Sequence, residues 1–198
     1  MKSSDKKIIS QAKKDPACFE KIYNKYYQKV YNYFWYRLGY DREKAEEMMQ
    51  EVFLRAFSKL KTYKHRNYSY LTYLLTIARN LFINYLKKEK ESVSWDEIKN
   101  FTISGNEILH NILDAQYLYN IIERYLSDNE REAVLLRYRE GLSIKEISQV
   151  MRKSENAVKL LLSRARKKLK ERYVSSNVLS VINDTTPYKK PKFLKVKE

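Results

Sequence analysis

The residues best suited to binding chemistry lie in one stretch, SENAVKLLLSRARKKLKER, which occupies Ser154–Arg172. At about 100° per residue, a helix over this stretch gathers apolar residues on one side: Val158, Leu161, Leu162, Ala165 and Leu169. The opposite side carries amide, hydroxyl and cationic groups and one leucine: Asn156, Lys159, Leu160, Ser163, Arg164 and Lys167. Such a side can meet phosphates and base edges, although a lone amphipathic helix is more often a solvated surface element.

The residues before this stretch favour nucleic-acid binding. Ser143 and Glu146 match a capping box for a preceding helix, SIKEISQVM, and Ser154 can cap the helix that follows. The connection around Arg152 and Lys153 is too short for two antiparallel helices, so the pair is predicted to cross steeply as a helix-turn-helix. The second helix of that motif enters the major groove of DNA. The solvated-face interpretation stays open beside this one.

A second candidate surface is the helix AEEMMQEVFLRAF, whose polar side is acidic and amide-bearing. Glu43, just before this stretch, and Glu47, Gln50 and Glu51 within it point away from its apolar stripe, along with Arg55. In a chain of net charge +16 such a side is poorly suited to DNA and better suited to a protein surface rich in arginine and lysine. The alternative is again a solvated helix face.

A third candidate is basic and aromatic: TYKHRNYSYLTYLLTIARNLFINYLKK. Its cations are Lys61, Lys64, Arg66, Arg79, Lys87 and Lys88, and they are interleaved with Tyr63, Tyr68, Tyr70 and Tyr73. Cations follow a phosphate backbone and aromatic rings stack on unpaired bases, so the segment suits melted DNA better than duplex. Each single tyrosine can equally be a core or boundary residue.

Composition agrees with a helical, DNA-binding protein and offers little for catalysis. The net charge of +16 indicates a polyanionic partner, even if A/T-rich codons have raised the lysine count. Cys18 is the only cysteine, so no internal disulfide forms and a cytoplasmic location is expected. His65 and His110 lie far apart, so no metal site is expected, and no phosphate loop or nucleophile motif indicates a cofactor or an enzyme. No apolar run approaches the roughly 18 residues of a membrane span.

The elements that would position these surfaces form an all-α chain of two small helical domains joined by a flexible linker, the second ending in the helix-turn-helix. We expect a basic N-terminal tail over 1–15 and a first domain over 16–91, with helices over about 16–39, 41–60 and 70–90. A linker over 92–107 precedes the second domain, 108–173, and a loose basic tail covers 174–198.

The three surfaces in this order resemble one family, the bacterial RNA polymerase sigma factors of the extracytoplasmic-function type. AEEMMQEVFLRAF is similar to the family's polymerase-binding helix, and YLTYLLTIARNLFINYLKK to its helix for the minus-ten element. LSDNEREAVLLRYREGLSIKEISQVMRKSENAVKLLLSRARKKLKE is similar to its domain for the minus-35 element. The resemblance implies a protein that binds core polymerase, reads both promoter elements and helps to melt the promoter. Promoter DNA is therefore an expected partner, and an anti-sigma factor is a possible one.

The resemblance also implies roles for single residues. Polymerase binding would use Glu47, Gln50 and Glu51 on the clamp helices of the largest subunit, while the second domain meets the flap of the second-largest. Minus-ten recognition and melting would use Lys64, His65, Arg66, Asn67, Tyr73, Arg79 and Asn80. Minus-35 recognition would use Asn156, Lys159, Leu160, Ser163, Arg164 and Lys167.

Three residues depart from the family pattern. Tyr73 stands where the family usually has Trp, and Asn84 where it often has Asp. Leu160 occupies an outward position that is commonly polar. It either packs on a neighbouring helix or contacts a thymine methyl group. These departures bear on the promoter sequence rather than on the role.

Two other functions compete with this one. A self-sufficient transcription regulator would bind its operator without polymerase, and the acidic-amide helix argues against it. A pure interaction module, such as a decoy for polymerase, would have no use for the basic-aromatic segment.

Overall fold

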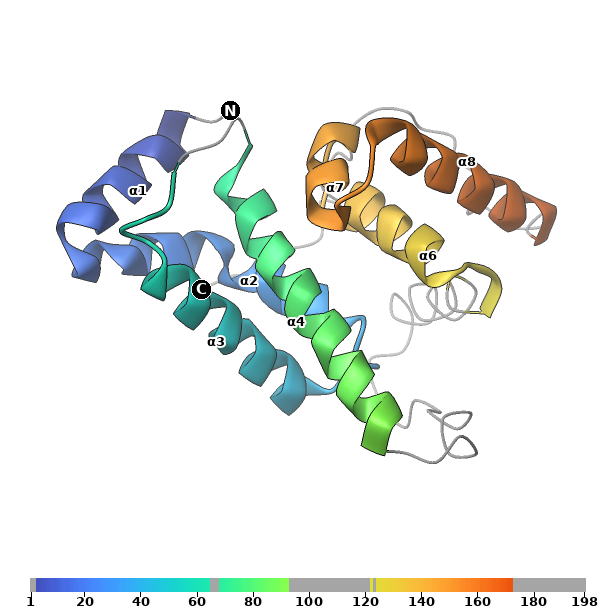
Figure 1. Cartoon of the computed structure of the whole chain (residues 1–198), viewed down its shortest axis with the longest axis horizontal. Helices are drawn as coiled ribbons and strands as arrows, with labels where there is room; N and C mark the ends of the chain where they lie inside the picture. Colours follow the sequence, from blue (N-terminus) through green and yellow to red (C-terminus); the bar gives the residue numbers. More distant parts are fainter. Residues whose placement is uncertain (1–2, 65–67, 93–121, 123, 173–198) are drawn as a thin grey trace, which may run out of the picture. The chain divides into compact units, whose positions relative to one another are not determined.

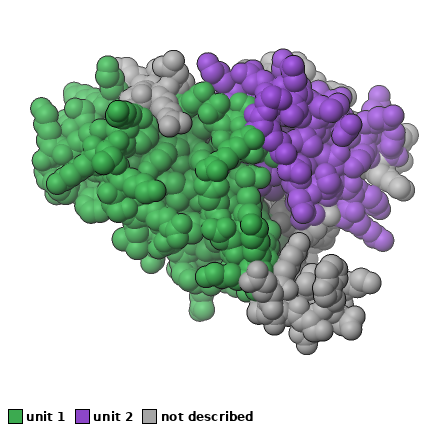
Figure 2. All heavy atoms as spheres, viewed as in Figure 1, with its two compact units in different colours: residues 1–107, 148–152 green, residues 108–147, 153–198 purple. Residues whose placement is uncertain are grey.

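The computed structural model describes residues 3–64, 68–92, 122 and 124–172. The chain divides into two compact units, Met1–Glu107 with Ser148–Arg152, and Ile108–Ile147 with Lys153–Glu198 (Figure 2). The described residues form helices and no strands, so the all-α prediction is confirmed.

Three long helices form the body of the first unit: α2 (Glu20–Trp35), α3 (Arg42–Ser58) and α4 (Tyr70–Ser92) (Figure 1). Each packs on the other two. Helical periodicity predicted the side chains that α2 and α3 bury, among them Ile22, Val30, Tyr33, Phe34, Val52, Phe53 and Ala56. Helix α4 buries Leu74, Leu75 and Ala78. Tyr27 and Phe57 belong to the predicted stripes but lie at their margins, 42% and 45% exposed.

Short sequence signals determine where these helices begin and end. The Asp41 carboxylate accepts a hydrogen bond from the Lys44 backbone N–H at 2.9 Å and so caps α3. Between α2 and α3 the chain reverses through Gly39 and Tyr40, whose φ values are 62° and 69°. Glycine adopts this left-handed conformation freely, whereas for Tyr40 it raises the conformational free energy by roughly 1 kcal/mol. Edge-on contact of its ring with the Trp35 ring, 5.3 Å between centroids, helps to offset that cost.

The expectation of an N-terminal tail over 1–15 is wrong for most of that segment. Ser3–Lys14 form helix α1, which leads through a short 3-10 helix, η1 (Pro16–Phe19), into α2. Ile9 and Ala12 are buried on its inner side, and Asp5 is buried with them. The many lysines obscured this pattern in the sequence, but they all face outward: Lys6, Lys7, Lys13 and Lys14.

The second unit contains α6 (Asp128–Val134), which continues into a π-helical turn, η3 (Leu135–Arg139), and α8 (Glu155–Arg172). Helix α6 packs on α8, and apolar side chains of both are buried: Ala133, Val134, Val158, Leu162, Ala165 and Leu169. Between η3 and α8 runs α7 (Ile144–Met151). The expected linker, the C-terminal tail and most of the helix expected before Leu126 lie outside the described residues.

Both predicted caps of the helix-turn-helix are confirmed. The Ser143 hydroxyl accepts from the Glu146 N–H at 3.2 Å, and the Glu146 carboxylate accepts from the Ser143 N–H at 3.0 Å. The Ser154 hydroxyl accepts from the Ala157 N–H at 3.2 Å and caps α8. Arg152 takes a left-handed conformation, with φ of 52°, which turns the chain within the short connection. The sequence therefore predicts where both helices of the pair begin.

Candidate nucleic-acid and protein interfaces

The outward face of α8 is the first candidate surface, and it is accessible along its whole length. All six predicted residues are exposed: Asn156, Lys159, Leu160, Ser163, Arg164 and Lys167. Four of the five predicted stripe residues are buried, and the fifth, Leu161, is half-buried. Leu160 is 50% exposed, so it does not pack into the core formed by the described residues.

Charge on this face is largely uncompensated within the described part of the chain. Lys167 lies 4.0 Å from Glu171, a distance at which an exposed pair contributes little. No ion pair among the described residues involves Lys159 or Arg164. The neighbouring Lys168 instead turns inward, where its ammonium meets the Glu130 carboxylate of α6 at 2.6 Å. The α8 face thus offers cations, an amide, a hydroxyl and one apolar side chain.

The polar face of α3 is the second candidate surface. Glu47 and Gln50 are exposed and Glu51 is half-buried. Glu47 pairs with Lys44 at 2.8 Å and raises its pKa, while Glu51 pairs with Arg55 at 2.5 Å. Both are pairs along one helix, worth about 0.5 kcal/mol or less, so a cationic partner can compete for the carboxylates.

Leu54 is a member of this face that sequence reasoning missed. It follows Gln50 by one helical turn and is 64% exposed, the largest exposed fraction among the exposed large hydrophobic residues described. An apolar residue off the buried stripe of α3 was the signal that could have found it. A single exposed leucine is common on protein surfaces, so Leu54 supports protein binding only together with the acidic and amide groups beside it. We call Glu47, Gln50, Glu51 and Leu54 the α3 face.

The third candidate surface lies at the start of α4. The rings of Tyr63, Tyr70 and Tyr73 contact one another with centroid separations of 4.8–5.3 Å. We call these residues the tyrosine cluster. Tyr70 is buried and therefore has a core role, and burial raises the pKa of its hydroxyl. Tyr63 and Tyr73 are half-buried, so each keeps part of its ring accessible.

Other predicted minus-ten residues surround this cluster only in part. Lys64 is exposed and next to Tyr63, whereas Arg79 and Asn80 are half-buried further along α4. His65, Arg66 and Asn67 lie outside the described residues. The structure thus places Tyr73 in the cluster, Lys64 next to Tyr63 in the chain, and Arg79 and Asn80 on the same helix as Tyr73.

Neither a metal site nor a membrane span is found in the described segments. They contain no group of three or more histidine, cysteine, aspartate or glutamate residues that could hold a metal ion. None of their helices is long and apolar enough to cross a bilayer.

Two family models match this chain. The sigma-70 region 2 model matches residues 22–92, and the sigma-70 region 4 model matches residues 117–169. The first range includes the α3 face and the tyrosine cluster. The second includes all the residues of the α8 face, the last of which is Lys167.

Several curated proteins are similar over most of the chain. SigM of Bacillus subtilis, an extracytoplasmic-function (ECF) RNA polymerase sigma factor, is 33% identical over 157 residues, which cover 78% of this chain and 94% of SigM. The B. subtilis ECF sigma factor SigW is 30% identical, with 84% of this chain and 95% of SigW covered. The ECF sigma factor BldN of Streptomyces coelicolor is 30% identical over 80% of this chain, which spans only 61% of BldN.

A solved structure supports the fold. CnrH in complex with the cytosolic domain of CnrY matches with a TM-score of 0.64 and 17% identity, over 86% of this chain and 97% of CnrH. The two matched regions and the identity to SigM over nearly its full length show the family. The chain belongs to the ECF RNA polymerase sigma factors of the sigma-70 family.

Proposed function

We propose that this sigma factor binds core RNA polymerase through the α3 face, reads a minus-35 element with the α8 face and opens the promoter at the tyrosine cluster. The observation that carries the proposal is the α8 face, where every predicted DNA-contacting side chain is exposed on a helix capped and presented by a tight turn. Promoter recognition in transcription initiation is the function of the family.

The chemistry of the α8 face suits a major groove. Lys159, Arg164 and Lys167 provide contacts to phosphates or to guanine edges, and Asn156 can pair with adenine. Ser163 can donate to or accept from either kind of base. Because the side chains nearest the N-terminus of such a helix approach the bases, Asn156, Lys159 and Leu160 are proposed as the base-reading residues.

The chemistry of the first unit suits polymerase and unpaired DNA. The α3 face presents carboxylates, an amide and a leucine, which complement a basic and partly apolar partner. We assign that partner to the clamp helices of the largest polymerase subunit, and the flap of the second-largest subunit to the second unit. An unstacked non-template base would be held by the tyrosine cluster and the residues assigned to the minus-ten element. These are Tyr63, Lys64, His65, Arg66, Asn67, Tyr73, Arg79 and Asn80.

Two further assignments follow from the family. The protein would act in the cytoplasm, where RNA polymerase works. An anti-sigma partner is proposed because CnrH, which shares this fold, is known in complex with the cytosolic domain of CnrY.

Run-off transcription tests this function. Core RNA polymerase from the bacterium that encodes the protein would be mixed with the full chain and a library of randomised promoters. We expect transcripts only when both proteins are present, from templates that share an upstream and a downstream element. Tight binding of the purified chain alone to the same upstream element would instead favour a self-sufficient regulator.

A further inference from the structure

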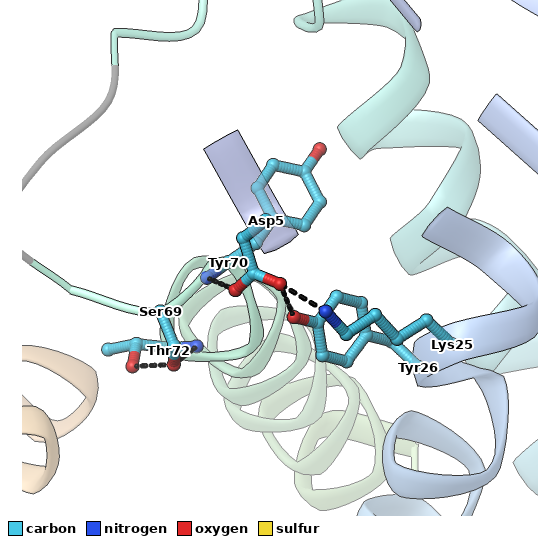
Figure 3. A network of polar contacts seen from close by, with 6 residues as sticks. All are labelled: Asp5, Lys25, Tyr26, Ser69, Tyr70 and Thr72. Carbon is cyan, nitrogen blue, oxygen red and sulfur yellow. Dashed lines mark hydrogen bonds and ion pairs between the residues drawn. The ribbon is translucent and has the colours of Figure 1, made fainter. Parts of the chain in front are cut away.

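Helix α1 contacts the chain at Tyr63, inside the connection between α3 and α4, and at Tyr70, the first residue of α4. The Lys13 ammonium donates a hydrogen bond to the backbone oxygen of Tyr63. The Asp5 carboxylate accepts from the backbone N–H of Tyr70, at a long distance of 3.5 Å (Figure 3). Residues far apart in sequence are thus joined on either side of the segment that contains Lys64.

Asp5 is fixed on its other side by α2. Its second oxygen accepts from the Tyr26 hydroxyl at 2.7 Å and from the Lys25 ammonium, and the side chain is only 4% exposed. Burial alone would raise the pKa of Asp5, but the hydrogen bonds from Lys25 and Tyr26 hold it below its ordinary value. The carboxylate is therefore a charged bridge between α2 and the first residue of α4.

The first turn of α4 carries the tyrosine cluster. Ser69 caps this turn, because its hydroxyl accepts from the Thr72 N–H at 3.3 Å and bonds the Thr72 hydroxyl at 2.9 Å (Figure 3). Tyr70 contacts the Tyr73 ring at 5.3 Å and the Tyr63 ring at 5.1 Å. A shift of the Tyr70 backbone would therefore move the accessible rings of Tyr63 and Tyr73.

We propose that Asp5 and Lys13 are positioning residues for promoter opening: they hold Tyr70 and Tyr63, and through them the rings that meet unpaired DNA. This inference rests on the proposed function and assigns to α1 a role in the opening step. Neither residue needs to touch DNA for that role. A binding site captures its ligand more readily when its side chains are already held in the binding geometry before the ligand arrives.

The Lys13 contact distinguishes positioning from simple stabilisation. Lys13 is exposed, and an exposed hydrogen bond adds little to the stability of a fold. Its bond to the Tyr63 backbone nevertheless holds the connection between α3 and α4 at the residue that places the Tyr63 ring against α4. Removing that bond should therefore alter opening more than it alters melting of the protein.

The test compares variants of the full chain in holoenzyme with core polymerase, on a promoter obtained from the library selection. Opening is followed by 2-aminopurine fluorescence on a duplex template and on a template already mismatched across the bubble. We expect Lys13→Met to slow opening of the duplex about threefold, since its hydrogen bond is exposed, and Asp5→Asn about tenfold, since its carboxylate is buried and bonds two side chains. On the mismatched template both should behave as the wild type.

Four controls make the result specific. Lys13→Arg keeps a donor and should restore opening, and Lys14→Met removes the same charge from an exposed neighbour and should have no effect. Thermal denaturation followed by circular dichroism should give Lys13→Met the same melting temperature as the wild type. The test then rests on Lys13→Met even if Asp5→Asn is partly unfolded. The dependence of promoter binding on salt should stay unchanged, because a lost phosphate contact would reduce its slope by about one.

Several results would overturn the inference. Wild-type opening by both Lys13→Met and Asp5→Asn would do so, as would an equal loss on both templates or a reduced salt slope. A wild-type protein that opens no promoter would instead refute the proposed function itself.

Discussion

Leu160 is the residue whose type fits its surroundings least. It is 50% exposed on a helix whose other exposed residues are polar or charged. Of the two explanations that the sequence left open, packing on a neighbouring helix finds no support among the described residues. Contact with a thymine methyl group in the major groove accounts for an apolar side chain at this position.

Leu160→Ser should therefore change base preference without changing stability. We expect preference for thymine at one position of the minus-35 element to fall by about 1 kcal/mol, with the melting temperature nearly unchanged. A panel of promoter variants in the run-off assay measures the first effect and thermal denaturation the second. Leu161→Ser is the matched control, because Leu161 is half-buried and its loss should lower melting and weaken all promoters alike. A destabilised Leu160→Ser protein with unchanged preference would make Leu160 structural.

The polar residues of the α3 face lead to a second prediction. Gln50→Ala combined with Glu51→Lys should weaken binding to core polymerase by about 2–3 kcal/mol while helical content stays the same, because both side chains point outward. Leu54→Ala should weaken the same binding. Titration of labelled protein with core polymerase measures both. Glu20→Lys, an exposed charge reversal in α2, controls for net charge, and wild-type affinity of the double variant would remove the α3 face from the interface.

Helices with a regular apolar stripe were predictable from the sequence. Helices whose apolar residues are few among many charged ones were not. Periodicity predicted α2, α3, α4 and α8, and the serine-to-glutamate spacing predicted the cap of α7. Helix α1 was missed because its lysines dominate composition, while its burial depends on two apolar residues and on Asp5, whose partners lie in other helices. The π-helical turn at Leu135–Arg139 was also missed, since one wider turn leaves local periodicity almost unchanged.

The candidate sites also differ in how far the sequence alone predicts them. Which α8 residues point outward follows from helical angles alone, whereas the tyrosine cluster depends on tertiary packing that brings Tyr63 against α4. Leu54 was overlooked because a single leucine on the outward side of a helix is common and carries no signal by itself.

One buried carboxylate adds an ion pair to the apolar contact between α6 and α8. Glu130 closes a capping box with Ser127 and binds Lys168 of α8 at 2.6 Å. Burial would raise its pKa, but the hydrogen bonds from Lys168 and Ser127 hold it below the ordinary value of 4.5. The ionised form is therefore favoured by folding, so its contribution to stability is present above pH 4.5 and is lost as pH falls below that value.

Glu130→Gln should consequently destabilise the second unit at neutral pH by about 1–3 kcal/mol. The difference from the wild type should shrink as pH falls below about 4.5, because the wild-type carboxyl is then protonated as well. Urea denaturation followed by circular dichroism at pH 7 and at pH 3 measures this difference. Glu155→Gln, an exposed change at the start of α8, is the control. A difference that does not depend on pH would mean that the charge of Glu130 is not what joins α6 to α8.

The whole molecule separates its candidate surfaces between two units. The α3 face and the tyrosine cluster belong to the first, and the α8 face to the second. Because each surface rests on its own unit, damage to one should leave the other folded and able to bind. Sites without shared contacts also tend to have additive effects.

This separation predicts that two sets of variants fail at different steps of initiation. Lys159→Ala with Arg164→Ala removes cations from the α8 face and should reduce occupancy of the closed promoter complex. Arg66→Ala with Asn67→Ala, residues assigned to base capture by family resemblance, should leave the closed complex occupied and reduce melting. Permanganate footprinting reports unpaired thymines and DNase protection reports occupancy, so the two assays distinguish the steps on one promoter.

Raising the concentration of holoenzyme should restore melting for the first set, since its defect is in binding, but not for the second. Failure of both sets at the same step would show that the two units do not divide recognition and opening between them.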